Sequence, residues 1–103
     1  MTRVIRPDDV PWTEPAEGVR YRATIRGDCR IRIVQFAPGF AEADWCCAAH
    51  IGYVINGILE VVFADSIELL SPGDILIIGA GDKHRARVIE GPVNLFLVEE
   101  PPS

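Results

Sequence analysis

The stretch from Gly73 to His84 constrains the fold of this 103-residue chain more than any other part of it. It opens with a Pro-Gly-Asp turn at 72–74, because proline presets φ and glycine accepts a positive φ. Four consecutive large apolar residues follow at 75–78, which is typical of a short strand buried on both faces. A Gly-Ala-Gly turn at 79–81 then reverses the chain, so we expect His84 to begin a return strand and to point into whatever the sheet encloses.

The rest of the chain divides into similar short segments. Apolar and polar residues alternate in several of them, and no segment has a sustained helical period behind a helix cap. The predicted strands cover residues 20–26, 29–36, 45–56, 58–63, 67–70, 75–78, 85–89 and 93–99, with turns at Gly57 and at 90–92. Many short strands separated by glycine and proline predict an all-β sandwich or barrel.

The opening stretch also resembles the second signature of the cupin family. Gly73, Gly81 and His84 have its spacing, and glycine stands at 79 where the family has proline. The apolar segment 51–57, which ends in glycine, resembles the end of the first cupin signature. The chain is therefore similar to the small single-domain, RmlC-like cupins. This resemblance implies a double-stranded β-helix, that is, a jelly-roll barrel.

Two terminal segments flank the expected barrel. Residues 1–19 are rich in Pro, Asp and Glu, so we expect an extended arm, with room for one short strand, against the domain or a partner subunit. Residues 20–99 would form the barrel and residues 100–103 a loose tail. Small cupins often dimerise by pairing or exchanging N-terminal strands, so the resemblance implies a homodimer.

The resemblance also implies a set of metal ligands. In the family, a His-x-His pair and a Glu from the first motif, with a His from the second, converge on one divalent metal inside the barrel. Counting back from Gly57, the Glu position falls on His50, the pair falls on Asp44 and Cys46, and His84 keeps the last position. If the loop differs by one residue, the pair falls on Trp45 and Cys47 instead. A thiolate among the ligands favours Zn or Fe(II).

Alternation along a strand agrees with this placement, because Asp44, Cys46 and His50 would point to the same side. The metal hypothesis is therefore a Zn or Fe site on His50, His84 and Cys46, with Asp44 as a fourth ligand. The alternative is a metal-free pocket in which the two histidines only form hydrogen bonds. Cys46 would then be a small buried residue, or a nucleophile paired with a histidine.

Three aromatic residues, Trp45, Tyr53 and Phe63, are candidates to line the pocket, although aromatic residues on barrel strands also serve as core. The expected function is that of a small-molecule-binding cupin with an altered site in the barrel interior. One form of it is a metal-dependent enzyme that acts on a small polar metabolite. The alternative is a non-catalytic, metal-free ligand-binding or structural cupin, because the fold does not specify the reaction.

Composition excludes several other classes of protein. The net charge of −5 argues against nucleic acid as a partner, and we expect the alternating Arg20, Arg22, Arg30 and Arg32 to lie on outer strand faces. No apolar run reaches the roughly 20 residues of a membrane helix. Three cysteines do not indicate a disulfide framework, and the N-terminus lacks an apolar signal segment, so we expect a cytoplasmic protein.

Overall fold

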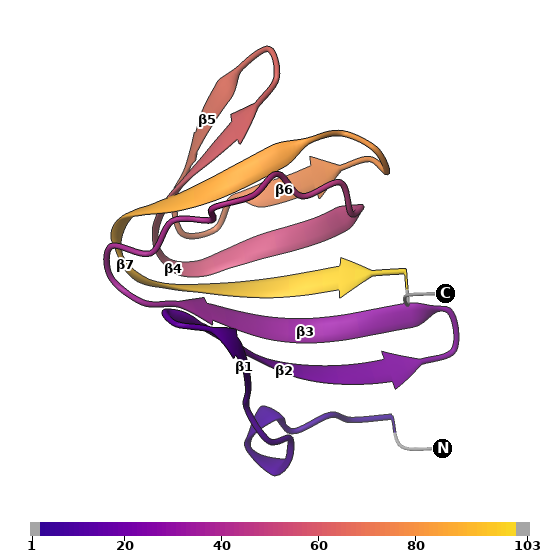
Figure 1. Ribbon diagram of the computed structural model, residues 1–103. Coiled ribbons are helices and arrows are strands. Elements are labelled where there is room, and N and C mark those ends of the chain that lie inside the picture. Colours follow the sequence, from indigo (N-terminus) through magenta and orange to yellow (C-terminus); the bar gives the residue numbers. More distant parts are fainter. Residues whose placement is uncertain (1–2, 101–103) are drawn as a thin grey trace.

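The computed structural model describes residues 3–100 and consists almost entirely of antiparallel strands (Figure 1). In chain order the elements are η1 (Pro7–Asp9), β1 (Thr13–Ala16), β2 (Val19–Arg26), β3 (Cys29–Phe36), β4 (His50–Phe63), β5 (Ile67–Leu70), β6 (Ile75–Ile78) and β7 (His84–Glu99). The predicted all-β class is confirmed. Within the described residues, the single 3₁₀ turn η1 is the only helix, so none is long or apolar enough to cross a membrane.

The strands form two layers that share their two longest strands (Figure 1). The first layer has the order β1-β2-β3-β7-β4-β6, in which β4 contributes residues 50–54 and β7 contributes residues 93–99. In the second layer, residues 58–63 of β4 pair with β5 and with residues 84–90 of β7. Both long strands therefore bend from one layer into the other.

The bend in β4 is a bulge at Gly57, where we expected a turn. Its φ of +85° suits glycine, and a Cβ there would lie 2.5 Å from the Pro92 carbonyl oxygen. Asn56 donates a hydrogen bond of 2.9 Å to that same oxygen, which ties the bulge to the neighbouring bend of β7. The predicted turn at 90–92 is likewise wrong, because β7 continues through these residues. A glycine with positive φ suits a bulge as well as a turn, and alternation alone does not separate the two.

The core lies between the layers, and the bulge changes which residues reach it. Val54 is fully buried before the bulge, and Leu59 is 1% exposed after it. These positions are five residues apart, so the inward side of β4 changes phase across the bulge. The expectation that β6 is buried on both faces is wrong: Ile78 is 3% exposed, but Ile77 is 76% exposed. β6 has one buried face and one open face.

The two arginines of β3 do not lie on an outer face, where we expected them. Arg30 and Arg32 point between the layers and line a cavity there, together with Val34. The alternate residues Ile31 and Ile33 face outward. Alternation shows that two sets of residues face opposite ways but does not tell which set faces in. Here the outward apolar set is covered by the N-terminal arm, which leaves the arginine set to the interior.

The arm lies against the outer side of its own sheet. Arg22, on β2, bonds to the carbonyl oxygen of Pro7 and pairs with Asp8 at 3.2 Å. The guanidinium groups of Arg20 and Arg22 lie 4.0 and 4.2 Å from the centre of the Trp12 ring. These two arginines do lie on an outer face, as expected, but the arm covers them. Of the expected loose tail, residues 101–103 lie outside the described residues.

Candidate metal centre

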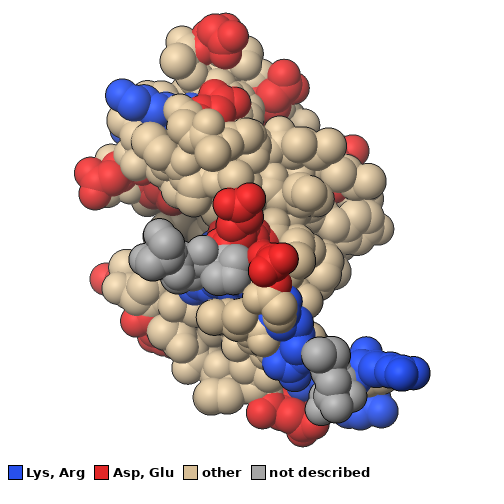
Figure 2. All heavy atoms as spheres, turned by 90° about the vertical axis from the view of Figure 1, so that its right-hand side faces the viewer, with Lys and Arg blue, Asp and Glu red and all other residues tan. Residues whose placement is uncertain are grey.

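A cavity of about 340 Å³ lies between the two layers. Most of its wall is apolar and comes from residues such as Val34, Leu59 and Leu97. Its polar side chains include Cys46, His50 and His84. Figure 2 looks at the end of the barrel that carries the C-terminus, and there acidic and basic side chains lie next to one another near the middle of the surface.

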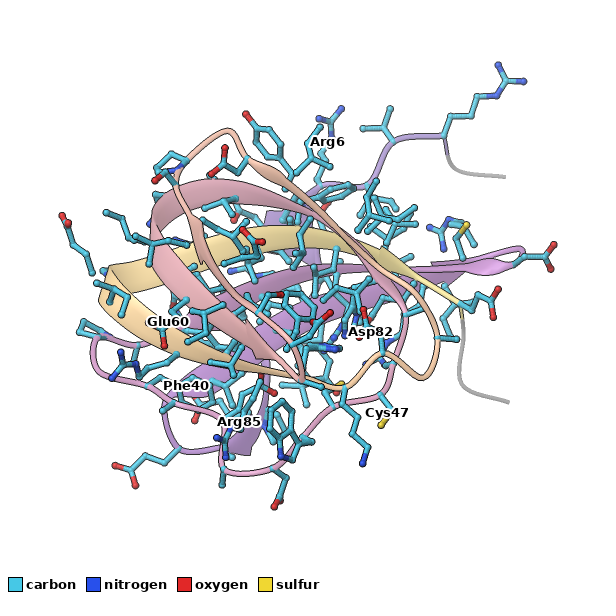
Figure 3. All side chains as sticks on the ribbon, turned by 90° about the horizontal axis from the view of Figure 1, so that it is seen from above. Arg6, Phe40, Cys47, Glu60, Asp82 and Arg85 are labelled. Atoms are coloured by element: carbon cyan, nitrogen blue, oxygen red, sulfur yellow. The ribbon has the colours of Figure 1, made fainter. Side chains whose placement is uncertain are left out.

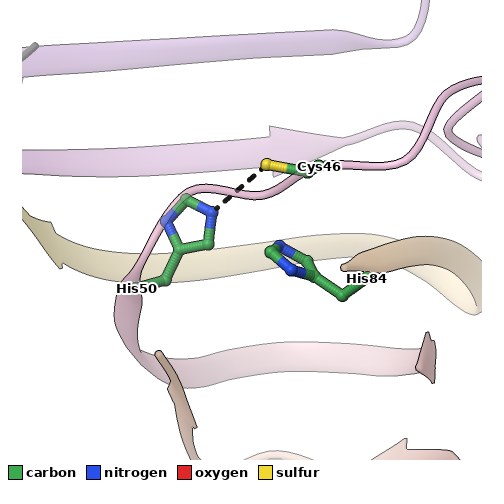
Figure 4. Close-up of side chains that lie close together, drawn as sticks. All are labelled: Cys46, His50 and His84. Carbon is green, nitrogen blue, oxygen red and sulfur yellow. Dashed lines mark hydrogen bonds between the residues drawn. The ribbon is translucent and has the colours of Figure 1, made fainter. Parts of the chain in front are cut away.

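Cys46, His50 and His84 converge in this cavity from three different segments (Figure 4). Their potential ligand atoms all lie within 4.8 Å of one another. Cys46 Sγ is 3.8 Å from His50 Nε2, and the two imidazole rings meet edge to face with centroids 5.2 Å apart. Two imidazole nitrogens and a thiol are a donor set that suits zinc and iron.

Two features of the backbone bring these residues together. His50 is the first residue of β4 and His84 is the first residue of β7. The expected strand at 45–49 does not form; instead, Cys46 makes an isolated bridge with His84. In this bridge each residue donates its N–H to the carbonyl oxygen of the other, at 2.8 and 2.9 Å. The loop before β4 is therefore fixed beside the start of β7.

Each histidine has its Nδ1 atom beside an acceptor. His84 Nδ1 lies 2.9 Å from the carbonyl oxygen of Asp82, which can only accept, so His84 donates from Nδ1. His50 Nδ1 lies 2.5 Å from Glu99 Oε2, close enough for an ion pair although not aligned as a hydrogen bond. With Nδ1 turned to these acceptors, Nε2 is the nitrogen of each ring that remains available to a metal. Metal-binding histidines are oriented in the same manner by carboxylate and carbonyl groups.

Glu99 is the site residue that sequence reasoning missed. Its side chain is 6% exposed, and Arg32 binds it with two contacts, at 2.5 and 2.9 Å. Burial alone would raise the pKa of Glu99, but the contacts with His50 and Arg32 outweigh burial and lower this pKa from 4.5 to about 2. A signal was present in the sequence: Glu99 continues the alternation of Val93 and Leu95, so it points inward with them.

The other predicted site residues lie elsewhere. Asp44 is exposed and does not belong to the cluster of three. Trp45 is 44% exposed and stacks with Arg85, whose guanidinium is 4.8 Å from its ring centre. Tyr53 is 45% exposed on the outer side of β4, and neither aromatic residue lines the cavity. Phe63 packs against the core with its ring 6.3 Å from that of His84.

The neighbours of the cluster in sequence point away from it. Seen from above, Cys47 and Arg85 extend outward from the barrel (Figure 3). Cys47 is exposed whereas Cys46 is partly buried, as expected for adjacent residues of an extended segment. Arg85 likewise alternates with the inward His84. His84 thus points into the enclosed space, as the sequence predicts.

Comparison with known proteins identifies the fold. Neither a family model nor a curated protein matches the sequence. Among solved structures, an RmlC-like cupin from Shewanella frigidimarina matches with a TM-score of 0.82 and 13% identity over 100% of this chain and 95% of its own. KdgF from Halomonas sp. matches with a TM-score of 0.83 and 20% identity over 100% and 97%. The Fe(II) form of HppE matches with a TM-score of 0.79 and 15% identity over 95% of this chain and 60% of HppE.

These likenesses define the chain as a small protein with the RmlC-like cupin fold. The predicted jelly roll is thereby confirmed. At identities of 13–20% the agreement is one of fold, so the function has to be argued from this chain's own residues.

Proposed function

We propose that the protein binds one divalent transition metal, Zn or Fe(II), through Cys46, His50 and His84. One observation carries this proposal: both histidines have Nδ1 held beside an acceptor, which turns Nε2 towards a thiol in the same cavity. Three protein ligands would leave a coordination position open, which is the arrangement of catalytic rather than structural metal sites.

The chain's own groups would have distinct roles around such a metal. Glu99 orients His50, and Arg32 holds Glu99 by its bidentate contact. The Asp82 carbonyl orients His84. When bound, the metal would supply Lewis-acid chemistry to a molecule in the cavity. The apolar walls would exclude water from that molecule.

The cavity also favours a class of ligand. Arg30 is half-buried in its wall, with its guanidinium 5.3 Å from the centre of the Tyr21 ring. Arg32 lies over the same ring at 5.0 Å, but it already has Glu99 as a partner. Among the described residues, Arg30 makes no ion pair with a carboxylate. We therefore propose a small metabolite with an anionic group near Arg30 and an apolar body against the wall. A volume of about 340 Å³ is at the small end of ligand pockets.

A second candidate function is thiol chemistry without a metal. Cys46 Sγ, His50 and Glu99 form a chain of contacts, at 3.8 and 2.5 Å, of the kind that activates a cysteine nucleophile. A metal-free protein that only carries its ligand would use the same cavity and Arg30. The thiols of Cys29, Cys46 and Cys47 are all free, which supports the cytoplasm as the place of action.

Metal content is the test of the leading proposal. Protein purified without a histidine tag, and then reconstituted with Zn, Fe(II), Mn or Ni, should hold close to one metal per chain. The substitution Cys46→Ser should abolish the sulfur-to-metal charge-transfer absorption of the Co(II) form. Cys47→Ser is the matched control, because Cys47 is exposed and points away.

The outcomes separate the candidates. Loss of metal in a His50→Ala/His84→Ala double variant, with normal binding by Cys47→Ser, supports the metal centre. Absence of metal from the reconstituted wild type refutes it. In that case, faster alkylation of Cys46 than of Cys47 by iodoacetamide, despite the lower exposure of Cys46, would favour thiol chemistry. Slower alkylation of Cys46 than of Cys47 would instead favour a metal-free protein that only binds its ligand.

A further inference from the structure

One carboxylate in the wall of the cavity has no cation beside it. Glu99 has Arg32 and His50 as partners, so its charge is balanced. Glu42 is half-buried and lines the same cavity, but among the described residues it forms no ion pair. Within residues 3–100, its carboxylate makes one hydrogen bond, in which Oε1 accepts the Ala86 N–H at 3.0 Å. The negative charge of Glu42 is therefore not balanced by a side chain of this part of the protein.

The backbone holds Glu42 in this position. Its own N–H donates to the Ala86 carbonyl oxygen at 2.9 Å, and its side chain accepts the N–H of the same residue. The side-chain oxygen thus takes the place of the carbonyl that a regular strand would offer to β7. Four residues later, Cys46 bonds in a similar way to His84 through its backbone. Glu42 and Cys46 attach the same loop to β7, and both line the cavity.

Glu42 and Arg30 lie in opposite layers of the barrel. Residues 84–90 of β7 belong to the second layer, where the loop that carries Glu42 is their neighbour on the side away from β4. Residues 93–99 belong to the first layer, where β3 has the same place. The loop and β3 therefore face one another across the cavity, and Figure 1 shows the chain passing from β3 to the other layer. Arg30 and Glu42 line one cavity but do not pair with each other.

We propose that the cavity binds a small zwitterion, an amino acid whose carboxylate lies at Arg30 and whose ammonium group lies at Glu42. Charges taken out of water need partners, because an isolated buried charge is costly. A ligand with only a negative charge would leave Glu42 without a partner, and a cation would leave Arg30 without one. A ligand with both charges satisfies both residues. This inference rests on the proposed function through the anionic ligand at Arg30, but it does not depend on the metal.

An ammonium group suits Glu42 better than a hydroxyl group does. An ionised carboxylate only accepts hydrogen bonds, and a bond from a charged donor is about twice as strong as one from a neutral donor. A hydroxyl group would also leave the negative charge of Glu42 in place. The apolar residues of the wall, such as Val34, Leu59 and Leu97, would contact the aliphatic part of the amino acid. The cavity should therefore prefer an amino acid to the hydroxy acid of the same carbon skeleton.

Isothermal titration calorimetry at pH 7 on the whole chain tests the proposal. The chain is freed of metal, so that an amino acid cannot bind as a chelator. The probes are L-leucine, β-aminobutyrate and γ-aminobutyrate, which place the ammonium group at increasing distances from the carboxylate. Their parent acids, isocaproate and butyrate, lack the ammonium group. At least one amino acid should bind about tenfold or more tightly than its parent acid, as expected for a hydrogen bond between charged groups. For the leucine skeleton, α-hydroxyisocaproate should bind like isocaproate.

Substitutions assign the two charges. Glu42→Gln should lower the affinity for the preferred amino acid by about tenfold and leave that for the parent acid unchanged. Glutamine can still accept the Ala86 N–H, but it carries no charge. Arg30→Gln should weaken the binding of both ligands. Glu60→Gln is the matched control, because Glu60 is also half-buried but alternates with inward Leu59 and pairs with Arg87 on the outer side. This control should change neither affinity.

The possible results distinguish the zwitterion from the anionic ligand. Amino acids that bind no more tightly than their parent acids overturn the zwitterion, while weaker binding of the parent acids by Arg30→Gln would keep the anionic ligand. A hydroxy acid that binds as tightly as L-leucine, or a preference for the amino acid that Glu42→Gln leaves intact, overturns the role of Glu42. Absence of binding by every probe overturns both the zwitterion and the anionic ligand. The metal centre has its own test in the metal content.

Discussion

Glu99→Gln in metal-free protein should remove a stabilising contribution that depends on pH. Glutamine has nearly the shape of the protonated acid but cannot carry the charge that Arg32 and His50 contact. The pKa of Glu99 falls from 4.5 to about 2 in the folded protein. At about 1.36 kcal/mol for each pKa unit, the ionised group contributes about 3 kcal/mol to the free energy of unfolding.

The sign of the pH dependence follows from the lowered pKa. Between about pH 2 and 4.5 the unfolded chain binds more protons at Glu99 than the folded chain does, so stability rises with pH across this window. The contribution is complete above about pH 5 and is lost as the pH falls through 2. At pH 3 it should be about 1.4 kcal/mol, less than half of its value at neutral pH.

Urea unfolding with a chelator present, followed by tryptophan fluorescence, measures the effect. The difference in unfolding free energy between wild type and Glu99→Gln should be about 3 kcal/mol at pH 7 and smaller by about 2 kcal/mol at pH 3. Glu60→Gln is the control, because Glu60 pairs with Arg87 at the surface, and its loss should cost less than about 1 kcal/mol at either pH. An equal difference for Glu99→Gln at pH 7 and pH 3 would show that the charge of Glu99 does not stabilise the folded protein.

Two further predictions concern the bend and the core. Gly57→Ala should lower the unfolding free energy by about 3 kcal/mol or more, because the new Cβ would meet the Pro92 carbonyl oxygen at 2.5 Å. Gly73 has a similar φ but open space around it, so Gly73→Ala should cost only about 1–2 kcal/mol. Leu59→Ala should cost about 2–5 kcal/mol because Leu59 is 1% exposed, whereas Leu69→Ala, at 60% exposed, should cost less than about 1 kcal/mol. Urea unfolding checks both, and equal costs within either pair would contradict the packing on which they rest.

The sequence predicted the parts of the site that depend on local spacing. Counting back from Gly57 against the cupin signature placed Cys46 and His50 at ligand positions, and the glycine turn placed His84 at the start of a return strand. The same count, and alternation along a regular strand, grouped Asp44 with them. The chain before His50 is instead a loop, and alternation does not extend through a loop.

The parts that depend on pairing between distant strands could not be predicted. Whether the arginines or the isoleucines of β3 face inward depends on what covers the other side, and the cover is an arm more than 20 residues away in sequence. Glu99 and Arg32 are separated by 67 residues. A carboxylate at the end of the chain has no local sign of its partner, although its phase with Leu95 and Leu97 does indicate that it points inward.

The bulge at Gly57 determines which changes in chain length the protein could accept. Deleting one residue from 55–57 would remove the bulge and its tie to the Pro92 carbonyl oxygen, so β4 would lose the bend that lets its two halves pair with β6 in one layer and with β5 in the other. An extra residue in the β2–β3 turn at Gly27, where the structure leaves open space, would change no pairing of this kind. Natural or engineered variants should therefore differ in length at the hairpin and keep a constant number of residues between His50 and Leu59.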